Sequence, residues 1–312
     1  MLVLLLLIIL AGGGAVFYIT NKMGREGEKP SAVDPSVQAK IRQSQYSQSG
    51  WQDEAKQVLS SFLAADSSAG KAAFSIRGSE LLPQMNDFYG NSPIDDSDTL
   101  LAGFATANLP AEDHKRGIFR MVYDQPPQFE MREFFRPLAP IEVQFGLQEP
   151  DLLLSSLAKA SNFSSEPVKV EVFFKREPDG LKVDWETFVQ TKYRTFRSFT
   201  ELPDPGRSGI FRLFVMEDVP EKGRASQGSK TYRLADPAHK NDSVRVEVPV
   251  DSELGRSLSI LNWRGVKDAR PVTKTVTLEL EWTKEASPRL VVKRFICWEF
   301  LGIGGQAVGG GK

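Results

Sequence analysis

The 312-residue sequence contains one cysteine and two histidines and has no surplus of basic residues. A single cysteine cannot form an internal disulfide, which excludes the small disulfide-stabilised secreted domains. The 39 Lys and Arg residues are balanced by 40 Asp and Glu. This balance argues against a nucleic-acid-binding protein, because such proteins usually carry an excess of positive charge. With 41% hydrophobic and 25% charged residues, the composition is that of an ordinary globular protein.

Charge is also absent from the first 20 residues of the chain. Residues 2–20 read LVLLLLIILAGGGAVFYIT. As a helix this run would span about 28 Å at ~1.5 Å per residue, which matches the hydrocarbon core of a bilayer. A cleaved signal peptide is the alternative, but it needs a basic start and a shorter apolar region. We therefore expect residues 1–20 to form an uncleaved single-pass transmembrane helix, which makes the lipid bilayer the first predicted partner.

The orientation of this helix depends on the residues that flank it. Lys22, Arg25 and Lys29 follow the apolar run, and the positive-inside rule applied to them alone would place them in the cytoplasm. A basic stretch ahead of Met1 would reverse that balance. Our expectation is an extracytoplasmic body.

Composition divides the rest of the chain into four parts. Residues 21–49 are rich in Ser, Gln, Gly, Pro and charge, which predicts a flexible polar linker. Residues 303–312 are a glycine-rich tail. The body between them is long enough for one large or two modest domains. We expect an α+β domain at 50–187 and a second α+β portion, rich in antiparallel strands, at 188–302.

Apolar periodicity predicts the elements of the body. Helical spacing runs from Trp51 to Phe62, and again from Ser79, a candidate N-cap, to Gly90, a candidate stop. Further helices are expected at 252–261 and from Trp185 to about residue 199. One stripe of the latter contains Phe188, Val189, Lys192, Phe196 and Phe199. Period-two alternation, together with turns such as the Pro-Asp-Gly at 178–180, predicts strands in both portions. These strands are expected at 118–123, 141–147, 168–175, 181–185, 210–216, 244–250, 275–282 and 290–300.

Several short strings resemble the NTF2-like (SnoaL-type) α+β domains. FLAA at 62–65, the short piece at 71–77 and ELLPQM at 80–85 look like the helical front of such domains. DGLKVDW at 179–185 looks like part of their long curved strands. The resemblance covers about residues 50–200 and implies helices packed on curved antiparallel sheets that form a cone.

The same resemblance bears on function. The arrangement of anchor, tether and α+β body is also similar to a class of uncharacterised single-pass membrane-anchored bacterial proteins. The NTF2-like family includes enzymes, ligand carriers and interaction modules, so the resemblance constrains the fold more than the function. In enzymatic members a pocket Asp or His usually acts as the base, and no Asp or His of this sequence matches that role.

The residues best suited to catalysis or metal binding are few and far apart. His114 and His239 both lie in polar, loop-like sequence, so we expect solvated loops, with a general base as the alternative for His114. Cys297 lies in a predicted strand and is expected to be a packed, inert thiol. The sequence therefore predicts no metal site and no cofactor, and it leaves any catalytic residue unknown.

Two short motifs lack the context that their chemistry needs. Ser156 and Lys159 match the S-x-x-K pattern of serine acyl-enzymes, but the S-D-N and K-T-G companions are absent from the sequence. Gly302, Gly304 and Ala307 mimic a dinucleotide-binding fingerprint, but no stretch long enough for the required helix follows them. We interpret this second motif as part of the flexible tail.

Two charged groups are interpreted as solvent-facing. The first comprises Asp95, Asp96 and Asp98, which we expect in a solvated loop, since the spacing lacks the alternating ligands and glycine of a calcium site. The second is the set of Lys192, Arg194 and Arg197, which is interleaved with aromatic residues in a manner typical of nucleic-acid binding. Helical spacing separates these residues into a charged face and an apolar face, which favours core packing instead.

Taken together, these patterns favour a membrane-tethered, non-enzymatic binding or scaffold protein of the cell envelope, with a protein or small-ligand partner and no nucleic acid. The alternative is a hydrolase or isomerase that works in an NTF2-like cone pocket. A pocket with a buried carboxylate or His114 would favour the enzyme. A pocket filled by side chains such as Trp185 and Phe174 would favour the binding protein.

Deletion of residues 2–20 tests the predicted anchor. We expect the full chain to sediment with membranes and to resist extraction by salt, because the apolar run has no polar surface to solvate. The truncated chain should stay in the supernatant, as immunoblots of both fractions would show. Recovery of the full chain, at unchanged size, wholly in the soluble fraction would contradict the anchor. A reporter fused after Lys312 decides the orientation.

Overall fold

The computed structural model of the chain describes residues 37–38, 43–90, 92–126, 167–220, 227–259 and 273–307. The predicted transmembrane helix, the predicted strand at 141–147 and the Ser156–Lys159 pair lie outside these residues. Among the described residues, no helix is both long enough and apolar enough to cross a membrane. The chain divides into two units, residues 1–49 and residues 50–312.

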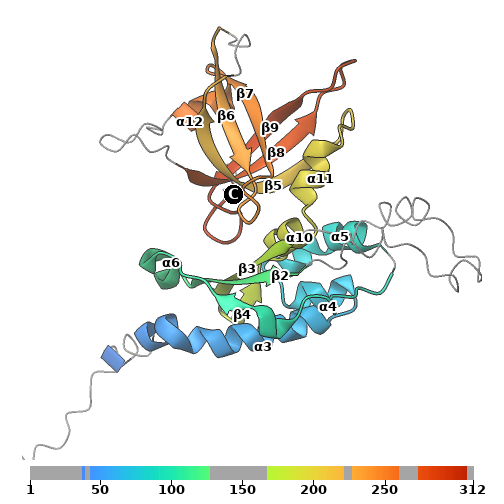
Figure 1. Cartoon of the computed structure of the whole chain (residues 1–312). Helices are drawn as coiled ribbons and strands as arrows, with labels where there is room; N and C mark the ends of the chain where they lie inside the picture. The colour runs from blue at the N-terminus through green and yellow to red at the C-terminus, as the bar shows by residue number, and fades with distance from the viewer. Residues whose placement is uncertain are drawn as a thin grey trace, which may run out of the picture. The chain divides into compact units, whose positions relative to one another are not determined.

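The first part of the body is a four-stranded antiparallel sheet with helices packed against it (Figure 1). The strand order follows the chain, β1-β2-β3-β4. A π-helical turn, η1 (Tyr46–Gly50), leads directly into the first long helix. The other elements are α3 (Trp51–Ala64), α4 (Ser68–Ala73), α5 (Gly78–Tyr89), η2 (Leu101–Gly103), β1 (Ala105–Thr106), α6 (Ala111–Lys115), β2 (Ile118–Gln125), β3 (Val168–Glu177) and β4 (Gly180–Val183).

Helices α3 and α5 confirm the periodicity of the sequence. The buried stripe of α3 contains Ala55, Leu59 and Phe62, and Trp51 stacks on Phe119 of β2 with 4.7 Å between the ring centroids. Helix α5 ends at Gly90, whose positive φ of 66° favours glycine. The N-cap prediction for this helix was wrong. The helix begins at Gly78, after Arg77 in the left-handed conformation, so Ser79 lies within its first turn.

The β3–β4 hairpin forms where the turn sequence predicts it. Glu177 pairs with Gly180 across the two turn residues Pro178 and Asp179, and Gly180 has a φ of 124°. The predicted second strand is shorter than expected. It ends at Val183, and Trp185 begins a helix instead of continuing the alternation.

That helix, α10 (Trp185–Lys192), is buried on most of its circumference and covers an open strand edge. Strand β4 pairs with only the last four residues of β3, so the earlier backbone groups of β3 need other partners. Asp184 N–H donates to the carbonyl of Phe173 (2.8 Å), and Glu171 N–H donates to Thr191 Oγ1 (3.0 Å). Asp184, just before the helix, and Thr191 within it therefore supply hydrogen-bond partners on the edge of β3 that β4 leaves open.

A left-handed residue divides the single helix predicted from Trp185 onward. Arg194 has a φ of 48°, and α11 (Thr195–Glu201) begins after it. The break turns Phe196 and Phe199 of α11 into the core of the second sheet, where both are buried. The apolar stripe of this helix was therefore predicted correctly, but its residues pack into two different hydrophobic cores.

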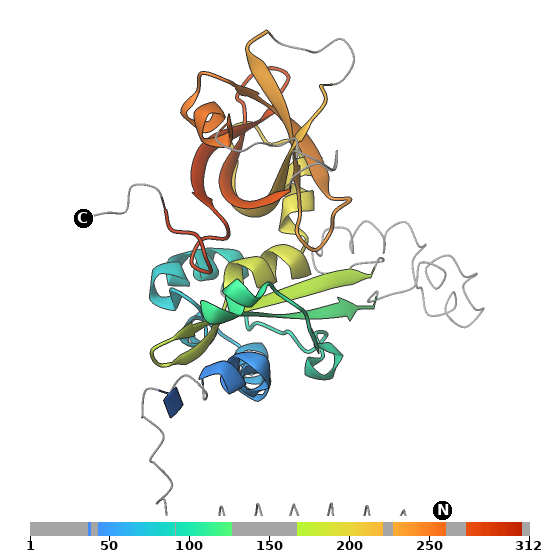
Figure 2. The ribbon, with the colours of Figure 1, turned by 90° about the vertical axis from the view of Figure 1, so that its left-hand side faces the viewer.

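The second part of the body is a curled five-stranded antiparallel sheet (Figure 2). The order is β7-β6-β5-β8-β9, and the two edge strands β7 and β9 approach each other. Sequence periodicity predicted all of these strands except β6, whose residues mix polar and apolar types. The elements are β5 (Ser208–Asp218), β6 (Ser229–Ala235), β7 (Ser243–Pro249), α12 (Glu253–Ser259), β8 (Lys274–Trp282) and β9 (Leu290–Trp298).

Strand β5 shows how this sheet is built. Phe211, Leu213 and Val215 point into the apolar interior of the curled sheet and are buried. Arg212 lies on the opposite face of the same strand, yet its side chain is only 2% exposed. Other elements of the body must therefore cover this face and supply its charge partners.

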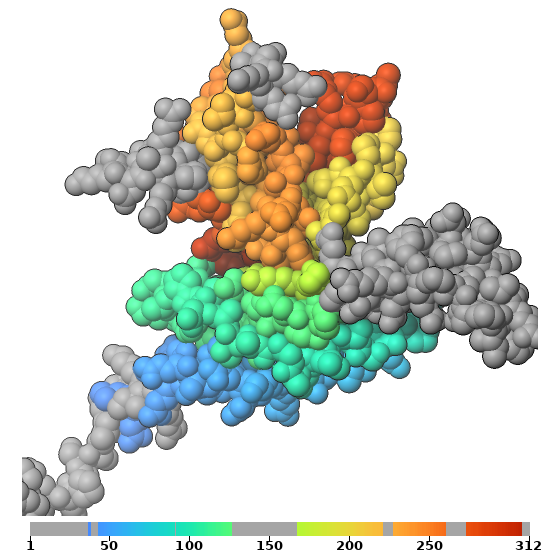
Figure 3. Space-filling view, in the orientation of Figure 1, coloured from blue at the N-terminus to red at the C-terminus, as the bar shows by residue number. Residues whose placement is uncertain are grey.

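Helix α10 supplies most of the partners of Arg212. Gln190 Nε2 donates to the carbonyl of Arg212 (2.7 Å), while Arg212 N–H donates to Gln190 Oε1 (2.9 Å). The Arg212 guanidinium donates to Glu186 Oε2 (2.5 Å) and to the carbonyl of Leu301 (2.7 Å), and it also pairs with Asp184 (3.2 Å). Because Glu186 also accepts from Arg77 (2.6 Å), one helix joins α5 to β5 through buried charge. On the face shown in Figure 3, only a narrow yellow-green band of residues 168–192 reaches the surface.

The residues after β9 return to the first sheet. Phe300 and Ile303 are buried against Ile118 of β2 and Phe173 of β3. Arg116 and Glu299 form a two-point ion pair above them, with donor–acceptor distances of 3.0 and 2.6 Å. The tail predicted for residues 303–312 is described only as far as residue 307, and its first residue, Ile303, belongs to this apolar cluster.

Two residues of β5 provide a matched test of the buried interior. Leu213→Ala should lower the free energy of unfolding by about 2–5 kcal/mol, because it removes fully buried methyl groups and leaves a cavity. Ile210→Ala, on the same strand but 42% exposed, should change it by no more than about 0.5 kcal/mol. Urea unfolding followed by circular dichroism measures both. Similar losses in the two variants would contradict the assignment of the interior face.

Candidate functional site

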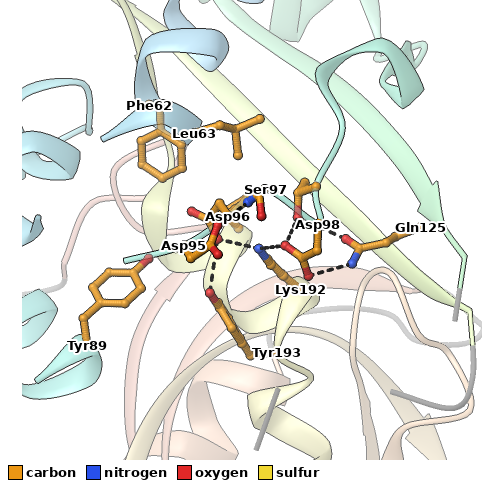
Figure 4. A network of polar contacts seen from close by, with 12 residues as sticks. Phe62, Leu63, Tyr89, Asp95, Asp96, Ser97, Asp98, Gln125, Lys192 and Tyr193 are labelled. Carbon is orange, nitrogen blue, oxygen red and sulfur yellow. Dashed lines mark hydrogen bonds and ion pairs between the residues drawn. The ribbon is translucent and has the colours of Figure 1, made fainter. Parts of the chain in front are cut away.

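Asp96 is the centre of a buried network of charges (Figure 4). Its side chain is fully buried, and its two oxygens face two lysines. Lys71 Nζ donates to Oδ2 at 2.5 Å, and Lys192 Nζ donates to Oδ1. The prediction that this acidic segment is a solvated loop was therefore wrong for Asp96, although Asp95 is exposed as predicted. A buried carboxylate stays charged only where cations compensate it, and here two do so.

Lys71 is buried because it also caps a helix. Its ammonium donates to the carbonyls of Phe62 (2.6 Å) and Leu63 (3.3 Å), which lie at the end of α3 and have no partner within the helix. Together with Asp96 these carbonyls give Lys71 three acceptors for its three donors. Burial lowers the pKa of Lys71, and the charge and hydrogen bond of Asp96 oppose that shift. The geometry fits a structural ammonium group with no free donor.

Lys192 overturns a second prediction. The sequence places it with Arg194 and Arg197 on a charged face, but its side chain is only 4% exposed and binds both Asp96 and Asp98. Arg194 pairs with Asp242 at 2.6 Å, and Arg197 pairs with Glu201 at 2.7 Å. Helical periodicity assigns Lys192 to both faces of the helix, and the buried aspartates decide in favour of the inside.

Asp98 attaches the same network to the end of β2. Lys192 Nζ donates to Asp98 Oδ1 (2.8 Å), and Gln125 Nε2 donates to Oδ2 (3.0 Å). The hydroxyl of Thr99 donates to Gln125 Oε1 (3.1 Å). Burial alone would raise the pKa of Asp98, but the hydrogen bond and charge of Lys192 outweigh it, so this pKa lies below its ordinary value. The loop that contains Asp96 and Asp98 is thereby held against both α10 and β2.

An aromatic cluster lies beside this network, formed by Phe88, Tyr89, Trp185 and Tyr193. The ring of Phe88 is 5.0 Å from Tyr89, 6.0 Å from Trp185 and 5.4 Å from Tyr193, measured between centroids. Tyr89 Oη accepts from Trp185 Nε1 (3.0 Å), and Tyr193 Oη donates to Asp96 Oδ1 (3.2 Å). Burial and the nearby Asp96 charge raise the pKa of both tyrosines, so both phenols stay neutral. Phe88 nevertheless remains 40% exposed to solvent.

The sequence around the cluster carries charge of one sign. No Lys, Arg or His occurs between Gly78 and Asp113, whereas Glu80, Asp87 and Asp95 in this stretch are exposed. Asp87 precedes Phe88, and Asp95 precedes the aspartate that binds Tyr193. We call this surface, formed by Asp87, Phe88, Tyr89, Asp95 and Tyr193, the acidic aromatic face.

The histidines and the cysteine that the sequence highlights are not brought together. His114 lies in α6, half-buried beside the stacked rings of Trp51 (6.4 Å) and Phe119 (5.3 Å), so its predicted solvated loop was wrong. His239 Nε2 lies 3.2 Å from the carbonyl of Thr191. Cys297 is buried, and burial raises the pKa of its thiol. In the described part of the chain, no three His, Cys, Asp or Glu residues converge to hold a metal ion.

No protein-family model, curated protein or solved structure matches the chain. Function must therefore be argued from the network and the face beside it. Sequence reasoning missed Lys71 and assigned Lys192 both to the apolar stripe and to the charged face of its helix. The sequence feature that could have revealed the network is the stretch from Gly78 to Asp113, which contains no basic residue. An aspartate buried within it must pair with a cation from another segment.

Removing one cation tests the network. Lys71→Met should lower the free energy of unfolding by about 3 kcal/mol, at the low end of the range for breaking a buried ion pair because Lys192 remains. Lys115→Met, which breaks a pair exposed by more than 70% on both sides, should change it by about 0.5 kcal/mol or less. Urea unfolding at pH 7 compares the two. Equal stability of both variants would show that Lys71 is not paired in the interior.

Proposed function

We propose that this protein is a membrane-tethered, non-enzymatic binding or scaffold protein of the cell envelope. Its body would bind a partner protein through the acidic aromatic face. One observation carries the proposal: Phe88 is exposed on a cluster of aromatic rings that a fully buried ion network supports from beneath. An exposed aromatic group on a rigid base is typical of the centres of protein interfaces.

The physical argument concerns the cost of binding. Aromatic side chains bury a large area and have few rotatable bonds, so they lose little conformational freedom in a complex. Tyr89 and Tyr193 are already fixed by their hydrogen bonds to Trp185 and Asp96. A surface that is ordered before binding keeps more of its contact energy as affinity.

Charge indicates the class of partner. Asp87 and Asp95 are exposed and directly precede Phe88 and Asp96 in the chain, and the surrounding stretch of sequence supplies no cation. Complementary charge accelerates association and excludes partners of the same sign. The face therefore fits a segment that carries Lys or Arg next to apolar residues, since these cations also interact favourably with aromatic rings.

Membrane attachment and the NTF2-like resemblance remain part of the proposal. The uncharged run at 2–20 and the polar linker at 21–49 support a tethered body, which we place outside the cytoplasm. The segments that carry the resemblance form helices α3 to α5 and the β3–β4 hairpin. These elements support a cone-like first domain within the α+β architecture.

The alternative function, a hydrolase or isomerase acting in an NTF2-like cone pocket, also has one supporting observation. Glu171 is a buried carboxyl group whose Oε2 has no hydrogen-bond partner among the residues that the structure describes, and burial raises its pKa, as a general acid or base requires. Trp185 and Phe174 are both buried in the core, which supports the binding function instead. We therefore rank the enzyme second.

Peptides of matched length test the proposed face. Fluorescence anisotropy with the full chain in detergent micelles should show binding of a peptide rich in Lys, Arg and Leu, and none of its Glu-substituted counterpart. Phe88→Ser should weaken this binding about tenfold or more, because it removes the central aromatic contact. Leu202→Ser, at a still more exposed apolar residue (65%, against 40% for Phe88) just after α11, should leave it unchanged.

Two outcomes would contradict the proposal. One is equal binding of the basic and acidic peptides, and the other is equal affinity in wild-type protein and the Phe88→Ser variant. Turnover of a model ester that disappears in Glu171→Gln, with unfolding unchanged, would favour the enzymatic alternative.

A further inference from the structure

The side chains of Glu171 and Arg120 form an incomplete charge pair on the first sheet. Arg120 of β2 lies opposite Phe173 of β3, and Glu171 lies two residues before Phe173, so both side chains share one face. The side chain of Glu171 is only 4% exposed, and that of Arg120 is 26% exposed. Arg120 Nη1 and Glu171 Oε1 are 3.7 Å apart, which is longer than a hydrogen bond.

Each partner keeps a buried polar atom that no group of the described residues satisfies. These atoms are Glu171 Oε2 and Arg120 Nε. Buried polar groups are almost always hydrogen-bonded, because a bare donor or acceptor loses its water without replacement. The pair therefore combines an unused carboxyl oxygen and an unused N–H donor in two side chains whose nearest charged atoms are 3.7 Å apart.

Each group also has contacts of its own. The Arg120 guanidinium lies over the Phe173 ring, 5.8 Å from its centroid, and Nη2 is 3.5 Å from the carbonyl of Asn108. The backbone N–H of Glu171 donates to Thr191 Oγ1 of α10. None of these contacts involves Glu171 Oε2 or Arg120 Nε.

Several charged groups act on Glu171. Burial raises its pKa most, Asp236 raises it further, and Arg120, Lys169 and Lys240 lower it, with a net shift above the ordinary value. His239 lies in the same turn as Asp236 and donates its backbone N–H to that carboxylate at 3.0 Å. The cation of α10, Lys192, points away toward Asp96.

We propose that Glu171 and Arg120 bind the carboxyl group of a small organic acid. One ligand oxygen accepts a hydrogen bond from Arg120 Nε–H, and the other shares a proton with Glu171 Oε2. A carboxyl group places two oxygens side by side and so satisfies both unused atoms at once. The site lies on different residues from the acidic aromatic face and does not depend on it.

Charge balance favours a monoanion over phosphate. Two carboxyl groups that share one proton carry a single negative charge, which the guanidinium of Arg120 neutralises. A phosphate dianion would add a second negative charge beside a buried carboxyl group, with no further cation in contact. Because Arg120 is partly exposed, such an acid can reach the pair from solvent.

The shared proton makes binding dependent on pH. Below the pKa of Glu171 its carboxyl group already holds the proton, and affinity is constant. Above that pKa the complex must take up a proton, so affinity falls by up to about tenfold per pH unit. A glutamine at this position would supply an N–H donor permanently and remove the dependence.

Isothermal titration calorimetry of the full chain in detergent micelles, with the monoanions acetate and benzoate as probes between pH 5.5 and 8, tests the site. Acetamide, and inorganic phosphate at pH 8, where it is mainly a dianion, serve as comparison ligands. We expect at least one acid to bind and neither comparison ligand to do so. Arg120→Lys, which lacks the Nε donor, should weaken binding at least tenfold. Glu171→Gln should still bind, with a flat pH profile.

Control variants test whether the pH dependence of binding comes from Glu171 or from a neighbouring group. His239→Gln should keep the wild-type pH profile, and Phe88→Ser should bind the acids normally, because it affects only the proposed partner surface. If Arg120→Lys fails to fold by circular dichroism, the pH profile of Glu171→Gln decides. The proposal is overturned if no acid binds, if acetamide or phosphate binds equally well, or if Glu171→Gln keeps the wild-type slope.

Discussion

An aspartate removed from water must be compensated by positive charge, and the packing around Asp96 follows from that requirement. Lys71 comes from α4 and Lys192 from the end of α10, so the two cations bring separate helices to one carboxylate. Lys71 also satisfies the last carbonyls of α3. Three helices and the loop before β1 are thereby fixed by one group of charges. Replacing one member leaves a buried charge short of a partner, which is why such networks behave as a unit.

Helix α10 extends the same principle to the second sheet. Its Lys192 binds the acidic loop, its Glu186 receives Arg77 and Arg212, and its Gln190 binds both backbone groups of Arg212. Apolar contacts alone would leave the relative placement of these elements loosely specified, whereas directional bonds to buried charges admit few arrangements. The helix that completes the first sheet therefore also positions the strand at the centre of the second.

The two proposed sites differ in how completely their buried charged groups are paired. At Asp96 every polar atom of the lysines and the carboxylate is matched, and the result is a rigid base for the aromatic rings above it. At Glu171 one carboxyl oxygen and one arginine N–H remain unmatched. A matched network stabilises a surface, whereas an unmatched pair is suited to receive a ligand. This contrast is the reason we assign a partner surface to the first and a small acid to the second.

The sequence by itself determined the elements that depend on local patterns. The apolar stripe from Trp51 to Phe62 predicts α3, the Pro-Asp-Gly turn predicts the β3–β4 hairpin, and the alternation in β5 and β8 predicts strands with one buried face. Strand β6 was missed because its alternation is weak. These successes share a cause, since the spacing of neighbouring side chains is fixed by the backbone of a helix or a strand.

Only the tertiary structure decided which charges are inside. Asp96 and Lys192 look like surface residues in sequence, and Lys71 lies in an Ala- and Ser-rich segment without a distinguishing pattern. Their burial depends on partners 25 and 96 residues away, whose positions no local spacing encodes. The same holds for Glu171 and Arg120, which meet across strands that lie apart in the chain. Periodicity specifies which face of an element is apolar, but the pairing of buried charges is set by long-range packing.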